Sequence, residues 1–250
     1  MKDADADRIP PAPDADWALF LDVDGTLTHH VDTPDAVVLG EQVRPALQRL
    51  DAMLEGAVAL VTGRSLEALD ALLDPLRMRH VAGLHGLEYR PAGTPGSGAA
   101  PIPHRFVQAA RELAARHDGA HVEAHGACLY LHWRAAPAAS GPMTRLAEDI
   151  AAGLATHRLH RGAHGIEIRP RGMDKGLAIR RFMAMPPFAG RTPVFAGDDP
   201  ADEPGFAVVN EMGGISVCVG ARRPSLARFA LADAGAVLDW LALHQAHAVN

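Results

Sequence analysis

The chain has 250 residues, of which 48% are hydrophobic and 22% are charged, and its formal net charge is −6. This content is sufficient to bury a core in roughly one or two domains. A net acidic chain has no general affinity for nucleic acid or for anionic membranes. No apolar run approaches the roughly 20 residues that cross a bilayer. The sequence therefore predicts neither nucleic acid nor membrane as a partner.

The chain's beginning and its cysteines indicate a reducing compartment. Residues 1–14 are acidic and rich in proline, which predicts a loose tail. They lack the basic and apolar segments of a secretory signal, so we expect a cytoplasmic protein. Cys128 and Cys218 lie far apart in unlike contexts, and we expect both to be buried reduced thiols. The 14 histidines show no linear zinc-site spacing, so we expect most of them at the surface.

The first third of the chain alternates between strand and helix patterns. Strands are predicted at about 17–22, 57–61 and 81–83, because each is a short apolar run. Between them, 42–54 carries Val43, Leu47, Leu50 and Leu54 on one helical face, and Ser65 can cap a helix that bears Leu66, Leu69 and Leu72. This rhythm predicts a parallel sheet with helices on both faces.

The middle of the chain follows a different pattern. A Gly- and Pro-rich stretch at 91–103 marks a boundary. The following residues predict a helix at 106–115, a hairpin at 121–134 with Gly126 at its turn, a break at 137–142, a helix at 143–156 and a strand at 165–169. This α-β-β-α-β unit predicts a small open sheet with helices on one face.

After residues 170–172 the earlier rhythm returns. A helix is predicted at about 176–185, strands at 194–196 and 215–219, and a last helix at about 236–244. We therefore expect an α/β fold with an inserted second domain. The main domain would comprise 15–103 and 172–250, and the insert 104–171.

The segment Asp22-Val23-Asp24-Gly25-Thr26-Leu27 directly follows the apolar run 17–21. Carboxylates at the end of a buried strand are costly unless they perform chemistry or hold a cation. One of them can act as a nucleophile, and the other can move a proton. The segment therefore indicates phosphoryl transfer through an aspartyl-phosphate.

Three further motifs are expected at the carboxyl ends of core strands or at a helix start, where open α/β sheets bind ligands. Thr62 precedes Gly63-Arg64, so a hydroxyl and a free backbone N–H can hold a phosphate oxygen. Lys175 adds positive charge. Gly197-Asp198-Asp199 adds carboxylates that would repel a phosphate without a hard cation such as Mg²⁺.

Each motif alone has a simpler explanation. An Asp-x-Asp-Gly run also occurs in calcium loops and turns, and Gly-Asp-Asp can cap a helix. The four motifs occur in order, three after predicted strands and one at a predicted helix start. This combination favours a phosphate-ester hydrolase. Such enzymes catalyse the reaction mainly by positioning and by electrostatic stabilisation.

The four motifs resemble those of the haloacid dehalogenase superfamily of phosphatases. Other segments are similar to those of trehalose-6-phosphate phosphatases: residues 83–88, 122–125, 132–134, 167–170, 174–176 and 197–203. The similarity spans about 17–241. It implies a Rossmann-like core, with a parallel sheet flanked by helices, and an inserted α/β cap that sets substrate specificity.

The resemblance also implies an activity. The expected reaction is Mg²⁺-dependent hydrolysis of trehalose 6-phosphate, a small-molecule sugar phosphate, to trehalose and phosphate. This reaction is the last step of trehalose biosynthesis, which implies functional coupling to a trehalose-6-phosphate synthase.

The resemblance assigns roles by position. Asp22 would be the nucleophile and Asp24 the acid/base, while Thr62 and Lys175 would hold the phosphate. The implied metal ligands are Asp22, the backbone carbonyl of Asp24, Asp198 and, at or near the ion, Asp199. The implied substrate-site residues are Thr26, Arg64, His85, Gly86, Glu123, His125, Arg134, Glu167 and Asp202, the last of which lies near the metal ligands.

Two pairs of residues on predicted strands support a sugar site. Glu123 shares a strand face with His125, and Glu167 shares one with Arg169, so Ile166 and Ile168 would point to the helix-covered face. Without the resemblance, an ordinary solvent-exposed sheet face is the simpler interpretation.

The chain also departs from the family pattern. His125 stands where the family usually has lysine, which would weaken sugar affinity or make it pH-dependent. Trp133 and Ala201 replace a tyrosine and a threonine, and we expect both to be tolerated packing changes.

Three alternatives remain. A related capped phosphatase would act on another sugar phosphate, such as sucrose phosphate or mannosyl-phosphoglycerate. A receiver-type signalling module also uses an acidic pocket with Thr and Lys, but Asp24 and the inserted domain disfavour it. A catalytically idle binding or regulatory domain would not need all four motifs.

Overall fold

The structure is a computed structural model that describes residues 9–28, 38–91, 100–162, 164–222 and 224–242. The chain divides into two compact units. Unit 1 comprises residues 1–96 and 174–250, and unit 2 comprises residues 97–173. The predicted insert at 104–171 falls within unit 2. Its role as a cap stays a prediction.

A seven-stranded sheet forms the centre of unit 1. Its strand order is β11-β10-β9-β1-β2-β3-β4, and every neighbouring pair is parallel except β3 and β4. The strands are β1 (Trp17–Leu21), β2 (Val58–Val61), β3 (His80–Gly83), β4 (Glu88–Arg90), β9 (Thr192–Gly197), β10 (Ile215–Val219) and β11 (Phe229–Leu231). Because β1 and β2 are buried along their whole length, their sequences are continuous apolar runs.

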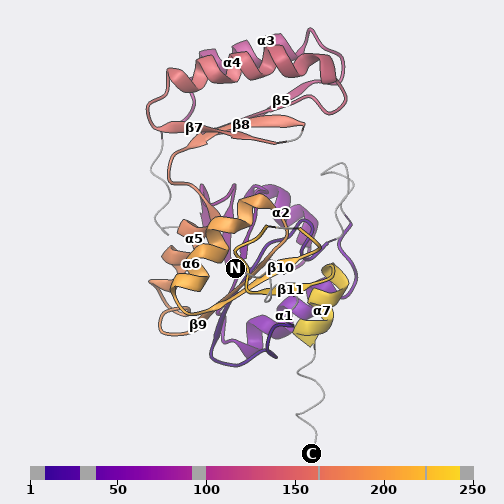
Figure 1. Ribbon diagram of the computed structural model, residues 1–250, viewed down its shortest axis with the longest axis vertical. Helices are drawn as coiled ribbons and strands as arrows, with labels where there is room; N and C mark the ends of the chain where they lie inside the picture. Colours follow the sequence, from indigo (N-terminus) through magenta and orange to yellow (C-terminus); the bar gives the residue numbers. More distant parts are fainter. Residues whose placement is uncertain (1–8, 29–37, 92–99, 163, 223, 243–250) are drawn as a thin grey trace, which may run out of the picture. The chain divides into compact units, whose positions relative to one another are not determined.

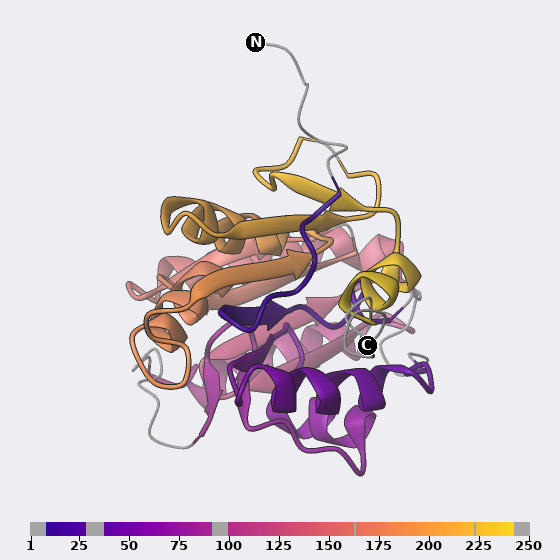
Figure 2. The ribbon, with the colours of Figure 1, turned by 90° about the horizontal axis from the view of Figure 1, so that it is seen from below.

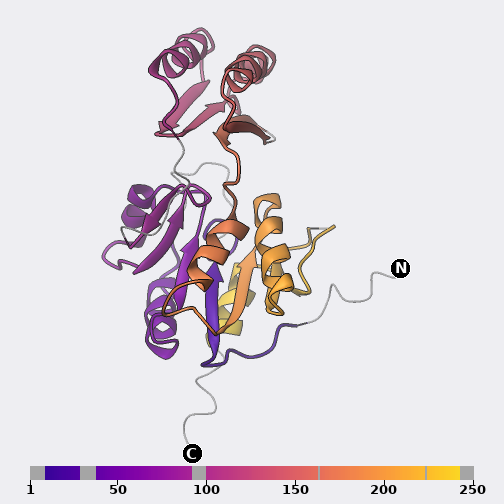
Figure 3. The same ribbon diagram turned by 90° about the vertical axis from the view of Figure 1, so that its left-hand side faces the viewer.

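Helices cover both faces of this sheet (Figures 2 and 3). They are α1 (Val43–Met53), α2 (Leu66–Leu73), α5 (Lys175–Met183), α6 (Glu203–Glu211) and α7 (Ala234–Ala242). Helices α1 and α7 contact each other on one face, and α5 and α6 contact each other on the opposite face (Figure 2). The predicted α/β architecture is confirmed.

Local sequence signals account for the ends of α1 and α2. Ser65 caps α2 by accepting a hydrogen bond from the backbone N–H of Ala68 at 3.2 Å, as predicted. After α1, the chain enters the left-handed region at Glu55 (φ 53°) and Gly56 (φ 88°). Glycine adopts this conformation without steric cost and so ends the helix.

An aromatic cluster joins α5 to the sheet. The Phe20 ring of β1 lies 5.4 Å from the Phe188 ring and 6.2 Å from the Phe182 ring, measured between centroids. All three side chains are fully buried. Because α5 begins at Lys175, this packing also positions the residue that the sequence assigned to phosphate binding.

Unit 2 is a four-stranded antiparallel sheet with both its helices on one face (Figure 1). The strand order is β5 (His121–His125), β6 (Cys128–His132), β8 (Gly165–Pro170) and β7 (His157–Arg161), and the helices are α3 (His104–Ala114) and α4 (Ser140–Ala152). Ile166 and Ile168 lie in the core beneath the helices, as expected. The opposite face carries the polar side chains.

Among the described residues, three strands and one α-helix escaped prediction. Strands β4 and β11 have three residues each, too few for a periodic pattern. Strand β7 reads His-Arg-Leu-His-Arg, with one strongly apolar residue. Helix α6 begins Glu-Pro-Gly, which resembles a turn; yet a Cβ at Gly205 would lie 2.4 Å from the Phe195 ring, so the glycine permits close helix–sheet packing.

The prediction of a loose tail is wrong for residues 9–14. Pro10 and Pro13 are buried, and the Trp240 indole N–H donates to the Pro11 carbonyl at 2.7 Å. Residues 1–8 of the predicted tail lie outside the described residues. Cys128 and Cys218 are both buried thiols outside any disulfide, as expected. Within the described ranges, no helix is both long enough and apolar enough to span a bilayer.

The aromatic cluster predicts a large loss of stability when a ring is removed. Phe182→Ala should lower the free energy of unfolding by about 3–5 kcal/mol, because it removes a buried ring and leaves a cavity. The matched control is Val38→Ala at an exposed position, which should change stability by less than about 0.5 kcal/mol. Equal denaturation midpoints for the two variants would contradict the assigned packing.

Candidate active site

Three of the predicted site residues follow directly after neighbouring strands of unit 1. Asp22 follows β1, Thr62 follows β2 and Asp198 follows β9. Since β1 lies between β9 and β2 and pairs with both in parallel, these residues lie at adjacent carboxyl ends of the sheet. Lys175 begins α5, where Asp174 caps the helix by accepting from the Leu177 backbone N–H at 2.8 Å.

Lys175 bridges two carboxylates inside the site. Its Nζ lies 2.8 Å from Asp22 Oδ1 and 2.7 Å from Asp202 Oδ1. All three residues are buried. Burial lowers the pKa of Lys175, but Asp202 and Asp22 outweigh it, so the pKa is raised and the ammonium stays charged.

Asp202 has both carboxylate oxygens engaged. Oδ1 accepts from Lys175, and Oδ2 accepts from the Asp199 backbone N–H at 2.9 Å. The Asp199 side chain in turn accepts from the Ala201 backbone N–H at 2.8 Å. This capping box fixes the loop after β9 and aims Asp202 at the lysine.

The carboxylates of Asp22, Asp198 and Asp202 form a cluster. One oxygen from each lies within 4.8 Å of the others. Thr26 Oγ1 donates to Asp198 Oδ1 at 3.2 Å. A Cβ at Gly25 would lie 2.1 Å from Asp198 Oδ2, and Gly25 has φ +83°, so only glycine fits in the turn beside this carboxylate.

The cluster carries more negative charge than its lysine neutralises. Burial, together with neighbouring carboxylates, raises the pKa of Asp22 to about 7 despite Lys175. Burial and the charge of Asp202 raise the pKa of Asp198 to about 7, and burial raises the pKa of Asp202. Oxygen-rich, under-neutralised clusters of this kind suit a hard divalent cation.

Asp24 is held by an arginine from the next strand's loop. Arg64 binds it in a bidentate arrangement, with Nε 2.7 Å from Oδ2 and Nη2 2.6 Å from Oδ1. The backbone N–H of Arg64 also donates to Thr62 Oγ1 at 3.1 Å. Sequence reasoning placed Arg64 at the substrate; the structure also brings it to Asp24.

His85 and Gly86 belong to the loop after β3. A Cβ at Gly63 would lie 3.0 Å from the His85 ring, so His85 stands over the Thr62 loop. Burial raises the pKa of Asp199, but the positive charges of Lys175 and His85 outweigh this effect, so the pKa is lowered. Leu84 (φ 47°) and His85 (φ 54°) are non-glycine residues in the left-handed region, and such strain concentrates at functional loops. Gly86 lies against the Tyr89 hydroxyl.

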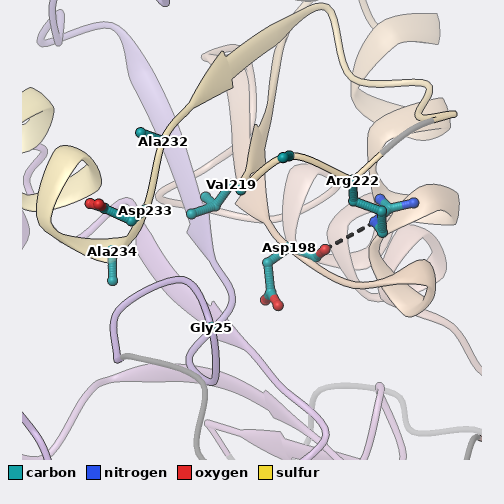
Figure 4. Close-up of a pocket in the computed structure, with 9 residues that line it drawn as sticks. Gly25, Asp198, Val219, Arg222, Ala232, Asp233 and Ala234 are labelled. Carbon is teal, nitrogen blue, oxygen red and sulfur yellow. Dashed lines mark hydrogen bonds between the residues drawn. The ribbon is translucent and has the colours of Figure 1, made fainter.

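A pocket of about 310 Å³ lies beside Asp198 (Figure 4). Gly25, Asp198 and Arg222 line it, together with the last residue of β10 and the residues that follow β10 and β11. The Arg222 guanidinium donates to the Asp198 carbonyl at 2.9 Å and binds Glu203, which fixes the loop that carries Asp198. The pocket provides room for a ligand next to the acid cluster.

The remaining predicted site residues belong to unit 2. Strand pairing places Glu123, Tyr130, Glu167 and His160 in one row across its polar face. Glu167 and Arg169 are buried, so the face is not an ordinary solvated one at these positions. Arg134 is exposed just beyond the end of β6.

Several polar atoms on this face lack partners. Among the described residues, His132 Nε2, Glu167 Oε1 and Arg169 Nε are buried and form no hydrogen bond. Burial raises the pKa of Glu167, although Arg169 opposes the shift. Unsatisfied buried polar atoms are costly, and a hydroxyl-rich ligand would satisfy those of Glu167 and Arg169.

Sequence reasoning missed the other polar residues of this face: His121, Tyr130, His132, Arg158 and His160. A usable signal existed. With a two-residue turn at Gly126, residues 121 and 132 must be opposite each other, and so must 123 and 130.

Comparison with known proteins assigns the chain to a family. The family model described as Trehalose-phosphatase matches residues 20–234. The chain belongs to this trehalose-phosphatase family. It is therefore an enzyme of the phosphoric monoester hydrolase class.

Similar proteins of known name agree with the family. The trehalose-6-phosphate phosphatase of Escherichia coli (strain K12) is 41% identical over 238 residues, covering 92% of this chain and 87% of the relative. A probable trehalose-phosphate phosphatase of Sinorhizobium fredii is 38% identical over 217 residues, covering 84% and 80%.

Solved structures agree on the fold. The C-terminal domain of the C. albicans trehalose-6-phosphate phosphatase gives a TM-score of 0.74 at 20% identity and covers 91% of each chain. A haloacid dehalogenase-like hydrolase from Bacteroides thetaiotaomicron gives a TM-score of 0.64 at 17% identity, covering 89% of this chain and 97% of that chain.

The charge imbalance predicts a pH-dependent stabilisation by Mg²⁺. In metal-free protein, Asp22 and Asp198 have pKa values raised from 3.8 to about 7. The folded state therefore binds protons more tightly than the unfolded chain between these values, and stability falls as pH rises through that window. Mg²⁺ should offset the loss, so it should raise Tm more at about pH 8 than at about pH 5.

The matched control for this test is Asp118→Asn, at an exposed position of unit 2. It should keep the wild-type response, whereas Asp198→Asn should reduce it. An equal Mg²⁺ effect on Tm at both pH values would contradict the assigned cluster.

Proposed function

We propose that the chain hydrolyses trehalose 6-phosphate to trehalose and inorganic phosphate through an aspartyl-phosphate on Asp22. The observation that carries the proposal is the position of Asp22. Its side chain is buried just after β1, and its Oδ1 forms an ion pair with Lys175 Nζ at 2.8 Å. The printed names of the E. coli and S. fredii relatives support the substrate.

In the first half of the reaction, a carboxylate oxygen of Asp22 attacks phosphorus. The bond between phosphorus and the sugar oxygen breaks, and Asp24 donates its proton to that leaving oxygen. Arg64 keeps Asp24 in a single orientation for this transfer. Lys175 and the Thr62 hydroxyl bind phosphate oxygens, on which negative charge is spread.

In the second half, Asp24 takes a proton from water. The water oxygen attacks phosphorus and breaks the bond to Asp22, which releases phosphate and restores the carboxylate. Lys175 stabilises the returning negative charge of Asp22. Asp202 keeps the lysine in place because it accepts a hydrogen bond from it at 2.7 Å.

The donor set fits Mg²⁺, which the proposal requires. We infer that Asp22, Asp198 and the Asp24 carbonyl hold the ion, with Asp199 nearby, because both oxygens of Asp202 are already engaged. When bound, the ion supplies positive charge that offsets repulsion between the carboxylates and the phosphate dianion.

The polar face of unit 2 would recognise the sugar. Glu123, His125, Glu167 and Arg134 are the proposed contacts, and the buried unpartnered atoms of Glu167 and Arg169 support a ligand there. Sugar hydroxyls both donate and accept hydrogen bonds, which suits this mixture of groups.

A proposed physiological role follows from one relative. The bifunctional trehalose-6-phosphate synthase/phosphatase of Thermoproteus tenax is 32% identical over 225 residues, which cover 86% of this chain and 30% of that protein. The fusion supports coupling to a synthase. A cytoplasmic location stays a prediction.

The substrate proposal is tested by phosphate release from a panel. Trehalose 6-phosphate should give the highest kcat/KM, ahead of sucrose phosphate, mannosyl-phosphoglycerate and glucose 6-phosphate, and a chelator should abolish release. Asp22→Asn should lower kcat about 10⁴-fold or more, because an amide is a poor nucleophile. The exposed control Asp118→Asn should retain activity. Preference for another sugar phosphate would overturn the substrate, and an active Asp22→Asn would overturn the nucleophile.

The sugar face predicts a separate kinetic effect. Glu167→Gln should raise KM for trehalose 6-phosphate roughly tenfold or more, because a hydrogen bond to a charged group contributes about 1.5–3 kcal/mol. It should leave hydrolysis of p-nitrophenyl phosphate, which has no sugar, unchanged. Equal losses on both substrates would indicate a structural role for Glu167 instead.

A further inference from the structure

Three imidazoles surround one carboxylate on the polar face of unit 2. The distances from Glu123 Oε1 are 3.6 Å to His121 Nε2 and 3.4 Å to His132 Nε2. The other oxygen, Oε2, lies 3.5 Å from His125 Nε2. The mechanism proposed above uses neither His121 nor His132.

The strand register creates this cluster, although the linear sequence hides it. His121 lies opposite His132 across the β5–β6 pair, and their rings stack with centroids 4.5 Å apart. Glu123, two residues after His121 on β5, projects from the same face. The linear sequence shows no zinc-site spacing here because the clustered residues come from two paired strands and not from one linear motif.

The two distances from the Glu123 carboxylate match those of a tetrahedral metal centre. Zinc binds imidazole nitrogen and carboxylate oxygen at about 2.0–2.1 Å. Ligand atoms at tetrahedral positions around such an ion are therefore about 3.3–3.4 Å apart. The two distances from Glu123 Oε1 differ from this value by only a few tenths of an ångström, and one ligand atom from each of the three residues lies within 4.8 Å of the others.

Two further observations point to a ligand at this position. His132 Nε2 is buried and forms no hydrogen bond among the described residues, so it faces the cluster unsatisfied. His125 lies near Oε2 of Glu123, whereas His121 and His132 lie near Oε1. His125 can therefore orient the carboxylate without itself binding the metal ion.

We propose that His121, Glu123 and His132 form a binding site for a divalent transition-metal ion of the Zn²⁺ class. Two imidazoles and one carboxylate suit such ions, whereas Mg²⁺ prefers oxygen ligands alone. The site is distinct from the acid cluster of unit 1. Three protein ligands leave a fourth position open to water or to another ligand.

The consequence for catalysis rests on the proposed function. An ion on Glu123 removes that carboxylate from the sugar, so Zn²⁺ should raise KM for trehalose 6-phosphate. His121 has no assigned contact with the sugar. His121→Asn should therefore keep its zinc-free activity and lose the sensitivity to zinc.

The direct test is zinc titration of the full chain without a polyhistidine tag. Excess Mg²⁺ occupies the acid cluster, and Zn²⁺ binding is followed by calorimetry, with the visible absorption of Co²⁺ as a second probe. Wild type should bind one ion per chain. His121→Asn and His132→Asn should each weaken the affinity at least about tenfold, while the exposed control His104→Asn should match wild type.

Circular dichroism without metal establishes that the variants are folded. Failure of the wild type to bind Zn²⁺, or equal affinity in wild type, His121→Asn and His132→Asn, would overturn the site. Zinc binding at these residues with no change in KM would leave the site standing and overturn the assignment of Glu123 to the sugar.

Discussion

The active-site region of unit 1 depends on one buried ammonium group shared between two carboxylates. Lys175 lies 2.8 Å from Asp22 and 2.7 Å from Asp202, and all three are withdrawn from water. Burial, together with more carboxylates than one lysine neutralises, raises the pKa of Asp22 and of Asp198 to about 7 in the absence of a cation. The proposed requirement for a divalent metal ion rests on this excess of negative charge. A bound cation would offset the negative charge of the carboxylates and of the substrate phosphate.

The fold places this chemistry where little rearrangement is needed. Two of the acidic and hydroxyl groups follow the neighbouring strands β1 and β2, and the β9 loop is fixed by the Asp199–Asp202 capping box. Unit 2 is built differently, because helices cover only one face of its sheet and the other face carries polar side chains. Buried atoms of Glu167 and Arg169 without partners are costly in a structural sheet face and useful in a recognition surface.

Sequence reasoning predicted the α/β sheet, its inserted element and the order of the strand-end motifs, because buried parallel strands are continuous apolar runs and glycines mark their turns. The sequence could not show which partner each carboxylate of the acid cluster contacts. Asp202 was grouped with the substrate residues, whereas the structure pairs it with Lys175. That pairing depends on the close approach of α5 to the β9 loop. The cluster around Glu123 was missed for a similar reason, since His132 reaches it only through the hairpin register.

Asp22 is the proposed nucleophile, and its covalent bond to phosphorus can be detected directly. Wild-type enzyme would be mixed with trehalose 6-phosphate and Mg²⁺, quenched rapidly, reduced with borohydride and digested for mass spectrometry. Borohydride converts an acyl-phosphate of aspartate to homoserine. The account predicts this conversion at residue 22, and not in a substrate-free control. Conversion at Asp24, Asp198 or Asp199, or no conversion under turnover with efficient quenching, would contradict it.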